Sequence, residues 1–210
     1  MLKNISCIIS APSGTGKSSL IRSFLQTRLG NNFRLIISHT TRIMRSEEIN
    51  GKDYFFISKN IFKEMINSKN FLEYTYVFDN YYGTSFKSVF NEINNGFHIL
   101  FDTDFYGMQN IKKHFPESIS VFILPPSLES LYERLKIRNK KNEIQYKNLK
   151  MRIDRAKIDV KFYKNYDYTL VNNNFNTTLN NFKLIISAKK FQSIRHKQYI
   201  QNIINKILKD

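Results

Sequence analysis

A stretch near the start of the chain, SAPSGTGKSS at residues 10–19, carries residue types suited to holding phosphate. It follows an apolar run and precedes residues that favour a helix, so we expect a turn between a strand and a helix. Glycines 14 and 16 let backbone N–H groups curl around an anion at a helix N-terminus. Lys17 can bridge the terminal phosphates, and the Ser18 hydroxyl can join the shell of Mg²⁺. This turn therefore predicts binding of a nucleoside triphosphate.

The predicted triphosphate-binding residues are Ala11, Pro12, Ser13, Gly14, Thr15, Gly16, Lys17, Ser18 and Ser19. Ala11 stands where the phosphate-loop pattern has its first glycine, and its methyl group is tolerated if φ at this residue is negative. Further along, the apolar run FHILFD ends in Asp102, whose carboxylate can reach the magnesium shell from beside the loop. We therefore expect Mg²⁺ as the cofactor, with Ser18 and Asp102 as its protein ligands.

A second group of side chains suits a phosphate monoester. SHTTRIMRSEEINGKDYFF supplies Arg42, Arg45 and Tyr54, and NYYGTS adds Tyr82. Two guanidinium forks and two phenols can donate hydrogen bonds to one phosphate. The group indicates an acceptor that carries a phosphate.

The surrounding pattern predicts the elements that hold these residues. Apolar runs of strand length alternate with stretches at helical spacing: strands are expected at 5–9, 33–37, 96–102, 120–124 and 166–171. Helices are expected from about 17, up to about 113, from near 128 and from 177 onward. This order predicts an α/β fold, with a parallel sheet of the P-loop NTPase type covered by helices on both faces.

Two segments interrupt the alternation. Residues 38–95 contain short aromatic and polar pieces, which predict an inserted small β-rich subdomain beside the main sheet. Residues 129–161 are helical in pattern and rich in Arg and Lys, as expected of a charged lid. The single domain, 1–210, would then have its core in 1–37, 96–128 and 162–210.

Composition limits the classes of function. The 210 residues are 41% hydrophobic, enough for one sizeable core, and no apolar run is long enough to span a bilayer. The charge of +16, from 33 Lys and Arg against 17 Asp and Glu, attracts polyanions, but the lysines are scattered. We attribute much of it to biased coding composition and expect no specific nucleic-acid partner.

Cysteine and the N-terminus point to the cytosol. Cys7 is the single cysteine, cannot form an internal disulfide, and is expected to be a small buried apolar residue. The start, MLKNISCIIS, has no small-residue cleavage site, so a mature cytosolic protein with no membrane partner is expected.

The motifs together resemble the guanylate kinase family. SAPSGTGKSSL, SHTTR, GKDYFF, FLEY, NYYGTS, FDTD, FILPPS and LVNN stand in the family's order and spacing, over residues 5–188. The resemblance implies ATP-dependent phosphorylation of GMP, and of dGMP, to the diphosphate, with ADP as co-product and Mg²⁺ as cofactor.

The resemblance also implies roles for individual residues. Arg42, Arg45, Tyr54 and Tyr82 match the residues that hold the phosphate of GMP, and Ser38, Glu73, Thr84 and Asp104 match those that read guanine. The chemistry is consistent, because guanine presents N1–H and a 2-amino group that one ionised carboxylate can accept together. Adenine has neither donor, so AMP would leave Glu73 buried and unpaired.

The lid arginines of the family match Arg134, Arg138 and Arg152, which would close onto the transferring phosphoryl group. The implied catalytic residues are Lys17, Arg42, Arg134, Arg138 and Arg152. The chain departs from the family at Met44 and Glu47 in the acceptor loop, at IRN in the lid, and at Asn173 and Asn174.

Other readings of the sequence remain open at this point. A kinase for another small phosphate, such as ribose 1,5-bisphosphate, would have no use for the guanine-reading set. A non-catalytic guanylate-kinase-like scaffold would lack the triphosphate loop, and a nucleic-acid ATPase would need an aromatic and basic groove. Residues 177–210 form a basic, amphipathic helical stretch, which predicts a final helix packed on the sheet with a solvated tail, or alternatively a homo-oligomer contact.

Overall fold

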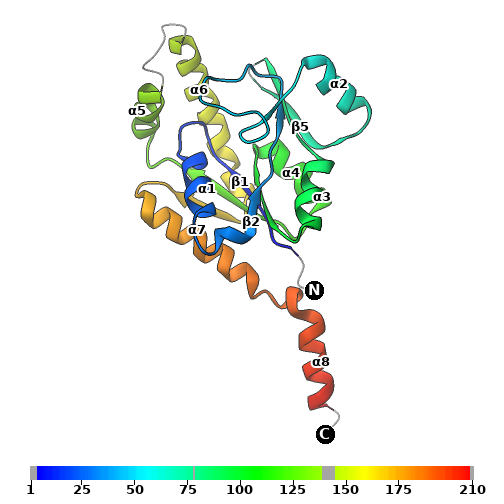
Figure 1. Ribbon diagram of the computed structural model, residues 1–210. Helices are drawn as coiled ribbons and strands as arrows, with labels where there is room; N and C mark the ends of the chain where they lie inside the picture. Colours follow the sequence, from blue (N-terminus) through cyan, green and yellow to red (C-terminus); the bar gives the residue numbers. More distant parts are fainter. Residues whose placement is uncertain (1–3, 78, 139–144, 209–210) are drawn as a thin grey trace.

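The computed structural model describes residues 4–77, 79–138 and 145–208, and of residues 138 and 145–148 only the backbone. Within these residues, five parallel strands form the main sheet in the order β2-β7-β1-β8-β9 (Figure 1). The strands are β1 (Ser6–Ser10), β2 (Phe33–Leu35), β7 (His98–Asp102), β8 (Ile119–Leu124) and β9 (Tyr168–Val171). The predicted α/β fold with a parallel sheet is confirmed.

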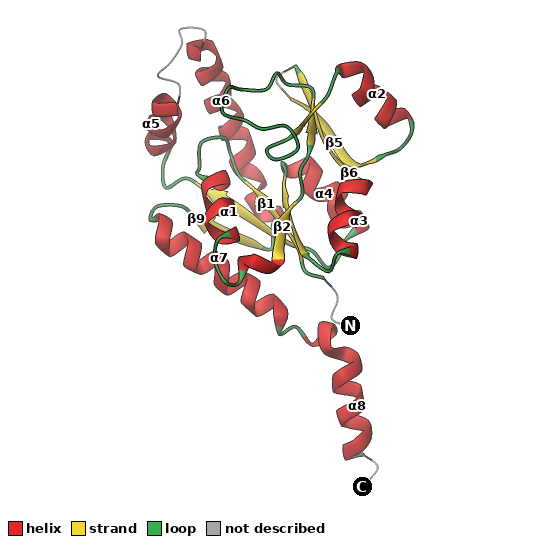
Figure 2. Cartoon of the chain, in the orientation of Figure 1, coloured by secondary structure: helices red, strands yellow, loops and turns green. Residues whose placement is uncertain are grey.

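Helices cover both faces of this sheet, because its apolar strands must be buried on both sides (Figure 2). On one face, α1 (Lys17–Leu25) and α7 (Phe175–Lys190) pack Phe24, Phe182 and Ile186 against the strands. On the other face lie α3 (Phe86–Asn94) and α4 (Phe105–His114), which pack through Val89, Met108 and Ile111. The resulting core fixes the sheet edge from which the phosphate loop emerges.

A second, mixed sheet stands beyond the carboxyl ends of the parallel strands (Figure 1). It consists of β3 (His39–Thr40), β4 (Phe55–Phe56), β5 (Phe71–Val77) and β6 (Asn80–Ser85), in the order β4-β3-β6-β5. Helix α2 (Lys59–Asn67) accompanies it, with Phe62 stacked on Phe71 at 4.3 Å between ring centroids. All of these elements fall within residues 38–95, whereas α3, in the same segment, packs on the main sheet.

The predicted lid segment forms two helices, α5 (Leu128–Arg138) and α6 (Gln145–Asp159). They pack through a small apolar cluster of Leu131, Leu135, Leu149 and Ala156. After α6, the 3₁₀ turn η2 (Val160–Asn165) stacks Phe162 on Phe105 of α4, with centroids 4.1 Å apart. The far end of α6 is thereby attached to the main body.

The C-terminal stretch is helical but not one helix. Helix α7 ends at Lys190, and His196 in the 3₁₀ turn η3 (Ser193–His196) bonds the Lys190 carbonyl through Nε2 at 2.7 Å. Helix α8 (Lys197–Ile207) then projects away from the body (Figure 1) and buries none of its side chains. The prediction of a final helix on the sheet therefore describes α7, and α8 corresponds to the tail.

Two further expectations concern Cys7 and membrane-spanning helices. Cys7 lies in β1 with 0% exposure, as expected of a small core residue, and burial raises the pKa of its thiol. In the described part of the chain, no helix has both the length and the apolar character needed to cross a bilayer.

Candidate active site

The loop between β1 and α1 has the backbone expected for anion binding. Gly14 and Gly16 have φ of 92° and 97°, the left-handed region that favours glycine. Gly16 precedes α1, and no side chain caps this helix end, so first-turn N–H groups remain for an anion. Among the described non-glycine residues, positive φ occurs at Lys69 and Asp79, so the methyl group of Ala11 is compatible with the loop.

Lys17 and Asp102 meet at the edge of the sheet. Asp102 ends β7, and its register opposite Ile9 of β1 places the carboxylate beside the loop. The Lys17 ammonium forms an ion pair with this carboxylate. The contact joins the loop to the predicted magnesium ligand Asp102, which is far from the loop in the sequence.

The donor set is compatible with magnesium. No cluster of three or more His, Cys, Asp or Glu side chains suited to a metal occurs in the described ranges. Mg²⁺ does not need one, because it is usually held by one or two protein oxygens together with substrate phosphates and water. The Ser18 hydroxyl, on the exposed first turn of α1, and the Asp102 carboxylate supply such oxygens.

Glu73 of β5 is buried among polar side chains. A β-bulge between residues 71 and 73 turns three successive side chains of β5 inward, and Glu73 is only 5% exposed. Its Oε1 accepts a 2.6 Å hydrogen bond from Thr84 Oγ1, which lies 3.2 Å from Ser38 Oγ. Three of the four predicted guanine-reading residues therefore form one chain of polar contacts.

Asp104 and Gly107 lie close to Glu73. Asp104 caps α4, accepting a 2.9 Å hydrogen bond from the Gly107 N–H. Gly107 allows close packing, because a Cβ there would lie 2.8 Å from Glu73 Oε2. Burial raises the pKa of Glu73 to about 7; the Thr84 hydrogen bond opposes this rise, and the Asp104 charge adds to it.

The predicted phosphate-holding residues also gather. The Arg42 guanidinium lies 5.6 Å from the Tyr54 ring centroid, and the Tyr54 and Tyr82 centroids are 6.0 Å apart. Burial raises the pKa of the Tyr54 phenol, and the next cause is the charge of Asp102. Tyr54 is therefore a neutral donor within electrostatic reach of Asp102, so the predicted acceptor and triphosphate sites adjoin.

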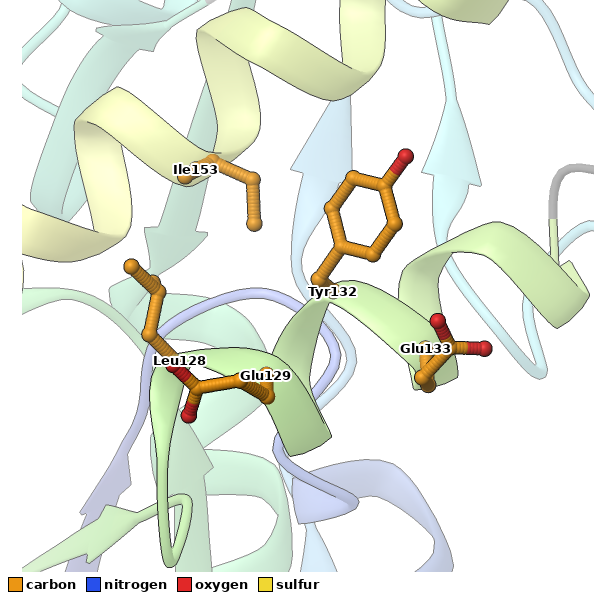
Figure 3. Close-up of a pocket in the computed structure, with 5 residues that line it drawn as sticks. All are labelled: Leu128, Glu129, Tyr132, Glu133 and Ile153. Carbon is orange, nitrogen blue, oxygen red and sulfur yellow. The ribbon is translucent and has the colours of Figure 1, made fainter.

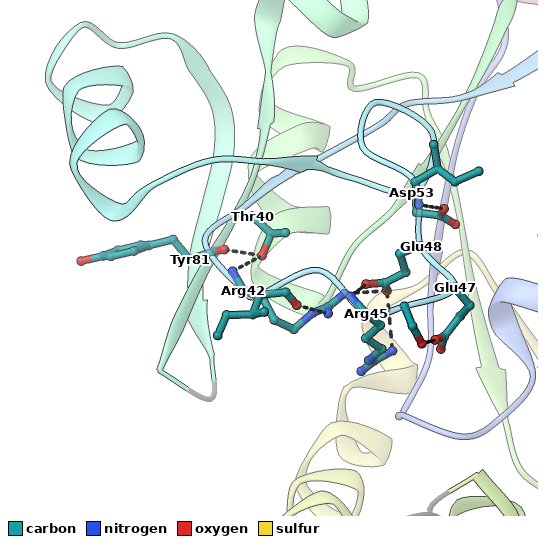
Figure 4. A network of polar contacts seen from close by, with 10 residues as sticks. Thr40, Arg42, Arg45, Glu47, Glu48, Asp53 and Tyr81 are labelled. Carbon is teal, nitrogen blue, oxygen red and sulfur yellow. Dashed lines mark hydrogen bonds and ion pairs between the residues drawn. The ribbon is translucent and has the colours of Figure 1, made fainter.

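Glu48 contacts both predicted phosphate-holding arginines and is not among the predicted site residues (Figure 4). Its carboxylate accepts hydrogen bonds from Arg42 Nη2 at 2.7 Å and from the Arg45 backbone N–H at 2.9 Å. Burial opposes its ionisation, but the contacts with Arg42 and Arg45 outweigh this and lower the pKa of Glu48. The sequence signal for Glu48 is its position as an acidic residue after Arg42 and Arg45 and before Tyr54.

The backbone before Arg42 is held as well. Thr40 Oγ1 donates to the Tyr81 carbonyl at 2.9 Å and accepts from the Arg42 N–H at 3.2 Å (Figure 4). The departures at Met44 and Glu47 thus lie in a loop that Thr40 and Glu48 anchor from both sides. Glu47 itself accepts a hydrogen bond from Ser46 Oγ at 3.0 Å.

The predicted lid arginines differ in position. Arg134 Nη1 donates to the Thr15 carbonyl of the loop at 3.2 Å, and Arg152 is half-buried on α6. The side chain of Arg138 lies outside the described residues. One turn beyond Arg152, Arg155 pairs with Asp159 at 2.8 Å; burial raises the pKa of Asp159, while Arg155 and the more distant Lys17 lower it.

A pocket of about 310 Å³ lies between α5 and α6 (Figure 3). Its lining residues are Leu128, Glu129, Tyr132, Glu133 and Ile153. None of them belongs to the predicted sites, and the two carboxylates would repel phosphates. The loop-facing side of α5 instead carries Leu131 and Leu135, which approach Gly14.

Comparisons with known proteins point to one family. Residues 3–189 match the family model described as guanylate kinase. The chain is 54% identical over 209 residues to the guanylate kinase of Wigglesworthia glossinidia brevipalpis, covering 100% of both chains. It is 40% identical over 203 residues to that of Escherichia coli (strain K12), covering 97% of each. The crystal structure of guanylate kinase from Anaplasma phagocytophilum superimposes with a TM-score of 0.73 at 25% identity, covering 93% of this chain and 90% of that one.

Proposed function

This chain belongs to the guanylate kinase family, and from that premise we propose how its residues carry out ATP-dependent phosphorylation of GMP to GDP. The observation that supports the assignment most is the adjacency of two different sites. The loop with Lys17 and the buried carboxylate of Glu73 both lie at the carboxyl edge of the main sheet, where α/β proteins bind ligands. The alternative activities considered from the sequence find no support in the family match.

The loop residues 11–19 hold the phosphates of ATP. Backbone N–H groups around Gly14 and Gly16 donate to them, and Lys17 leaves Asp102 to bridge the terminal phosphates. Ser18 and Asp102 are then the protein ligands that fit Mg²⁺, which supplies charge neutralisation when it is bound.

The acceptor is held at both ends. Arg42, Arg45, Tyr54 and Tyr82 donate to the phosphate of GMP, with Glu48 keeping the two arginines in place. At the other end, ionised Glu73 accepts the guanine N1–H and 2-amino group, and Asp104 is the second carboxylate of the base-reading set. The Ser38 hydroxyl donates to O6, and so does the Thr84 hydroxyl once its single proton turns from Glu73 to the base. The proposal extends to dGMP, because these groups recognise the base and the phosphate.

Transfer needs positioning and charge stabilisation more than a covalent catalyst. Lys17 and Arg42 supply positive charge on either side of the transferring group. Arg138 and Arg152 would add positive charge from the lid, residues 129–161. The inserted segment 38–95 supplies the acceptor site. These segment boundaries, and a cytosolic location, stay predictions.

The direct test is ADP release with ATP and Mg²⁺, offering GMP, dGMP, AMP, UMP and ribose 1,5-bisphosphate as separate acceptors. We expect turnover with GMP and dGMP, and less by about 10⁴-fold with AMP, because a site built for donor recognition rejects a base without those donors. Comparable turnover with AMP or with ribose 1,5-bisphosphate would contradict the assigned acceptor site.

We also propose that α8 mediates self-association. Its Ile200, Ile203, Ile204 and Ile207 recur at the spacing of one helical face and are 36–65% exposed. A second α8 could cover this face, as in a coiled coil.

Changing Ile200 and Ile204 together to Lys is therefore expected to shift the protein to its monomer mass of 25.0 kDa in sedimentation velocity, where the unmodified chain sediments as a larger species. Changing Asn202 to Lys, on the same helix, is the matched control and should leave the larger species intact. A wild-type chain that sediments at 25.0 kDa at every concentration would refute self-association.

A further inference from the structure

Two side chains from distant parts of the sequence converge on one atom of the phosphate loop. Arg134 of α5 donates from Nη1 to the carbonyl oxygen of Thr15 at 3.2 Å. Asn172, just after β9, donates from Nδ2 to the same oxygen at 2.6 Å. Arg134 Nη2 also donates to the Asn172 carbonyl at 3.0 Å, so the two residues are joined to each other as well as to the loop.

The two glycines of the loop allow Asn172 and helix α5 to approach it closely. A Cβ at Gly16 would lie 2.6 Å from Asn172 Nδ2, and one at Gly14 would lie 2.8 Å from Leu135 Cδ2. Asn172 is only 4% exposed and is held in turn by its own N–H, which donates to the Leu124 carbonyl at 2.8 Å. The approach is therefore close and fixed by the main sheet.

The orientation of the Thr15 carbonyl decides where the next N–H points. In a trans peptide, the C=O of one residue and the N–H of the next point in opposite directions. With the Thr15 carbonyl held toward Arg134 and Asn172, the Gly16 N–H points to the opposite side. Thr15 is itself buried, and its hydroxyl donates to the Pro12 carbonyl at 3.0 Å, which restricts rotation of this peptide further.

We infer that Arg134 and Asn172 are positioning residues for the phosphate loop, holding the Thr15 peptide so that the Gly16 N–H faces the phosphates of ATP. This role differs from direct contact with the transferring phosphoryl group, which the family resemblance implies for Arg134. It rests on the proposed binding of ATP phosphates by the loop. The inference predicts that Arg134 and Asn172 control the affinity both for ATP and for a triphosphate that carries no base.

The first test changes Asn172 to Asp, which keeps the shape but removes the donor and sets a carboxylate against the Thr15 carbonyl. The probe is inorganic tripolyphosphate, measured as a competitive inhibitor against ATP with Mg²⁺. We expect its inhibition constant and the KM for ATP each to rise about tenfold or more, with the KM for GMP changed less than about twofold. Changing Asn173 to Asp is the matched control, since it adds the same charge at the next, exposed position and should alter neither constant.

The second test changes Arg134 to Met, with Lys136 to Met on the exposed side of α5 as its control. Arg134→Met should raise the same two constants about tenfold. Combined with Asn172→Asp, it should add little, because two residues that act through one carbonyl are not independent. Arg134→Lys, which retains one donor, should fall between the wild type and Arg134→Met, and thermal unfolding of each variant checks that the fold is kept.

The outcomes separate the alternatives. A fall in kcat with unchanged inhibition by tripolyphosphate would place Arg134 on the transferring group and overturn the inference. Weaker binding of ATP with unchanged binding of tripolyphosphate would place both residues on the adenine, which also overturns it. A wild-type chain that neither turns over GMP nor is inhibited by tripolyphosphate would instead contradict the proposed function.

Discussion

Replacing Lys17 with Ala is expected to lower kcat by about 10²–10³-fold, the usual loss when one positioned charge is removed from a transition state. Lys17 is the cationic residue of loop 11–19, and in the structure it pairs with Asp102 at the sheet edge. Its ammonium would stabilise charge that spreads over the transferring phosphoryl group. The measurement is kcat by coupled ADP release, beside the Kd of GMP by calorimetry without ATP.

The dissociation constant of GMP should stay within about threefold, because the acceptor contacts of Arg42, Tyr54 and Glu73 do not involve Lys17. Lys112→Ala is the matched control: Lys112 also forms an ion pair, at 2.8 Å with Asp167, but on α4 away from the loop. It should keep kcat near that of the wild type. Equal losses of kcat and GMP affinity in Lys17→Ala would show that Lys17 supports the acceptor site instead.

Replacing Glu73 with Gln is expected to lower kcat/KM for GMP by about 10²-fold or more and to narrow the preference for GMP over AMP. The amide presents a donor where guanine also presents donors, and the site is too buried for water to relieve the mismatch. Rates with GMP and AMP provide the measurement. Glu64→Gln, an exposed carboxylate on α2, is the control and should change neither rate. Unchanged use of GMP would remove Glu73 from the base-reading set.

The same substitution should change the pH dependence. The pKa of Glu73 is about 7 in the unliganded protein, while guanine requires the ionised form. The KM for GMP should therefore rise as pH falls below 7 in the wild type, and Glu73→Gln should lose this dependence.

Glu73→Gln should raise the thermal stability of the protein although it lowers activity with GMP. Because the folded pKa of Glu73 lies above its usual value of 4.5, ionising it destabilises the folded chain. The penalty, on the order of 3 kcal/mol, is present in full above pH 7, shrinks as pH falls toward 4.5 and is absent below it. Glu73→Gln should thus unfold at a higher temperature than the wild type at pH 8. The two proteins should converge at pH 4.

Local sequence patterns predicted the parts of this molecule that depend on neighbours in the chain. The turn between β1 and α1 follows from an apolar strand, two glycines and a helix start within one short stretch, and the left-handed φ at Gly14 and Gly16 agrees with it. The alternation of apolar runs and helical spacing predicted the parallel sheet. Element ends were less predictable: the run at 33–37 forms a strand only at Phe33–Leu35, because the chain then leaves toward β3 in the second sheet.

The role of Glu48 is not predicted by local sequence patterns. The sequence shows its charge and its place near two arginines, but a carboxylate in a basic segment can equally well be exposed to solvent. Only the folded loop shows that it accepts from both Arg42 and the Arg45 backbone. The reason is that Thr40 anchors the loop, and the anchored loop brings Arg42 Nη2 and the Arg45 N–H within 3 Å of the Glu48 carboxylate. No local sequence pattern encodes this arrangement.

The sequence by itself determined the α/β fold, the phosphate loop and, through its ordered motifs, the family and its reaction. Tertiary structure alone decided that Arg134 and Asn172, 38 residues apart, meet at the Thr15 carbonyl, and that Glu73 is buried beside Asp104 with a raised pKa. The physical reason is that residue type and spacing set which hydrogen bonds and charges are available. Which of them pair, and how far each carboxylate is removed from water, depends on strands and helices that pack together from separate parts of the chain.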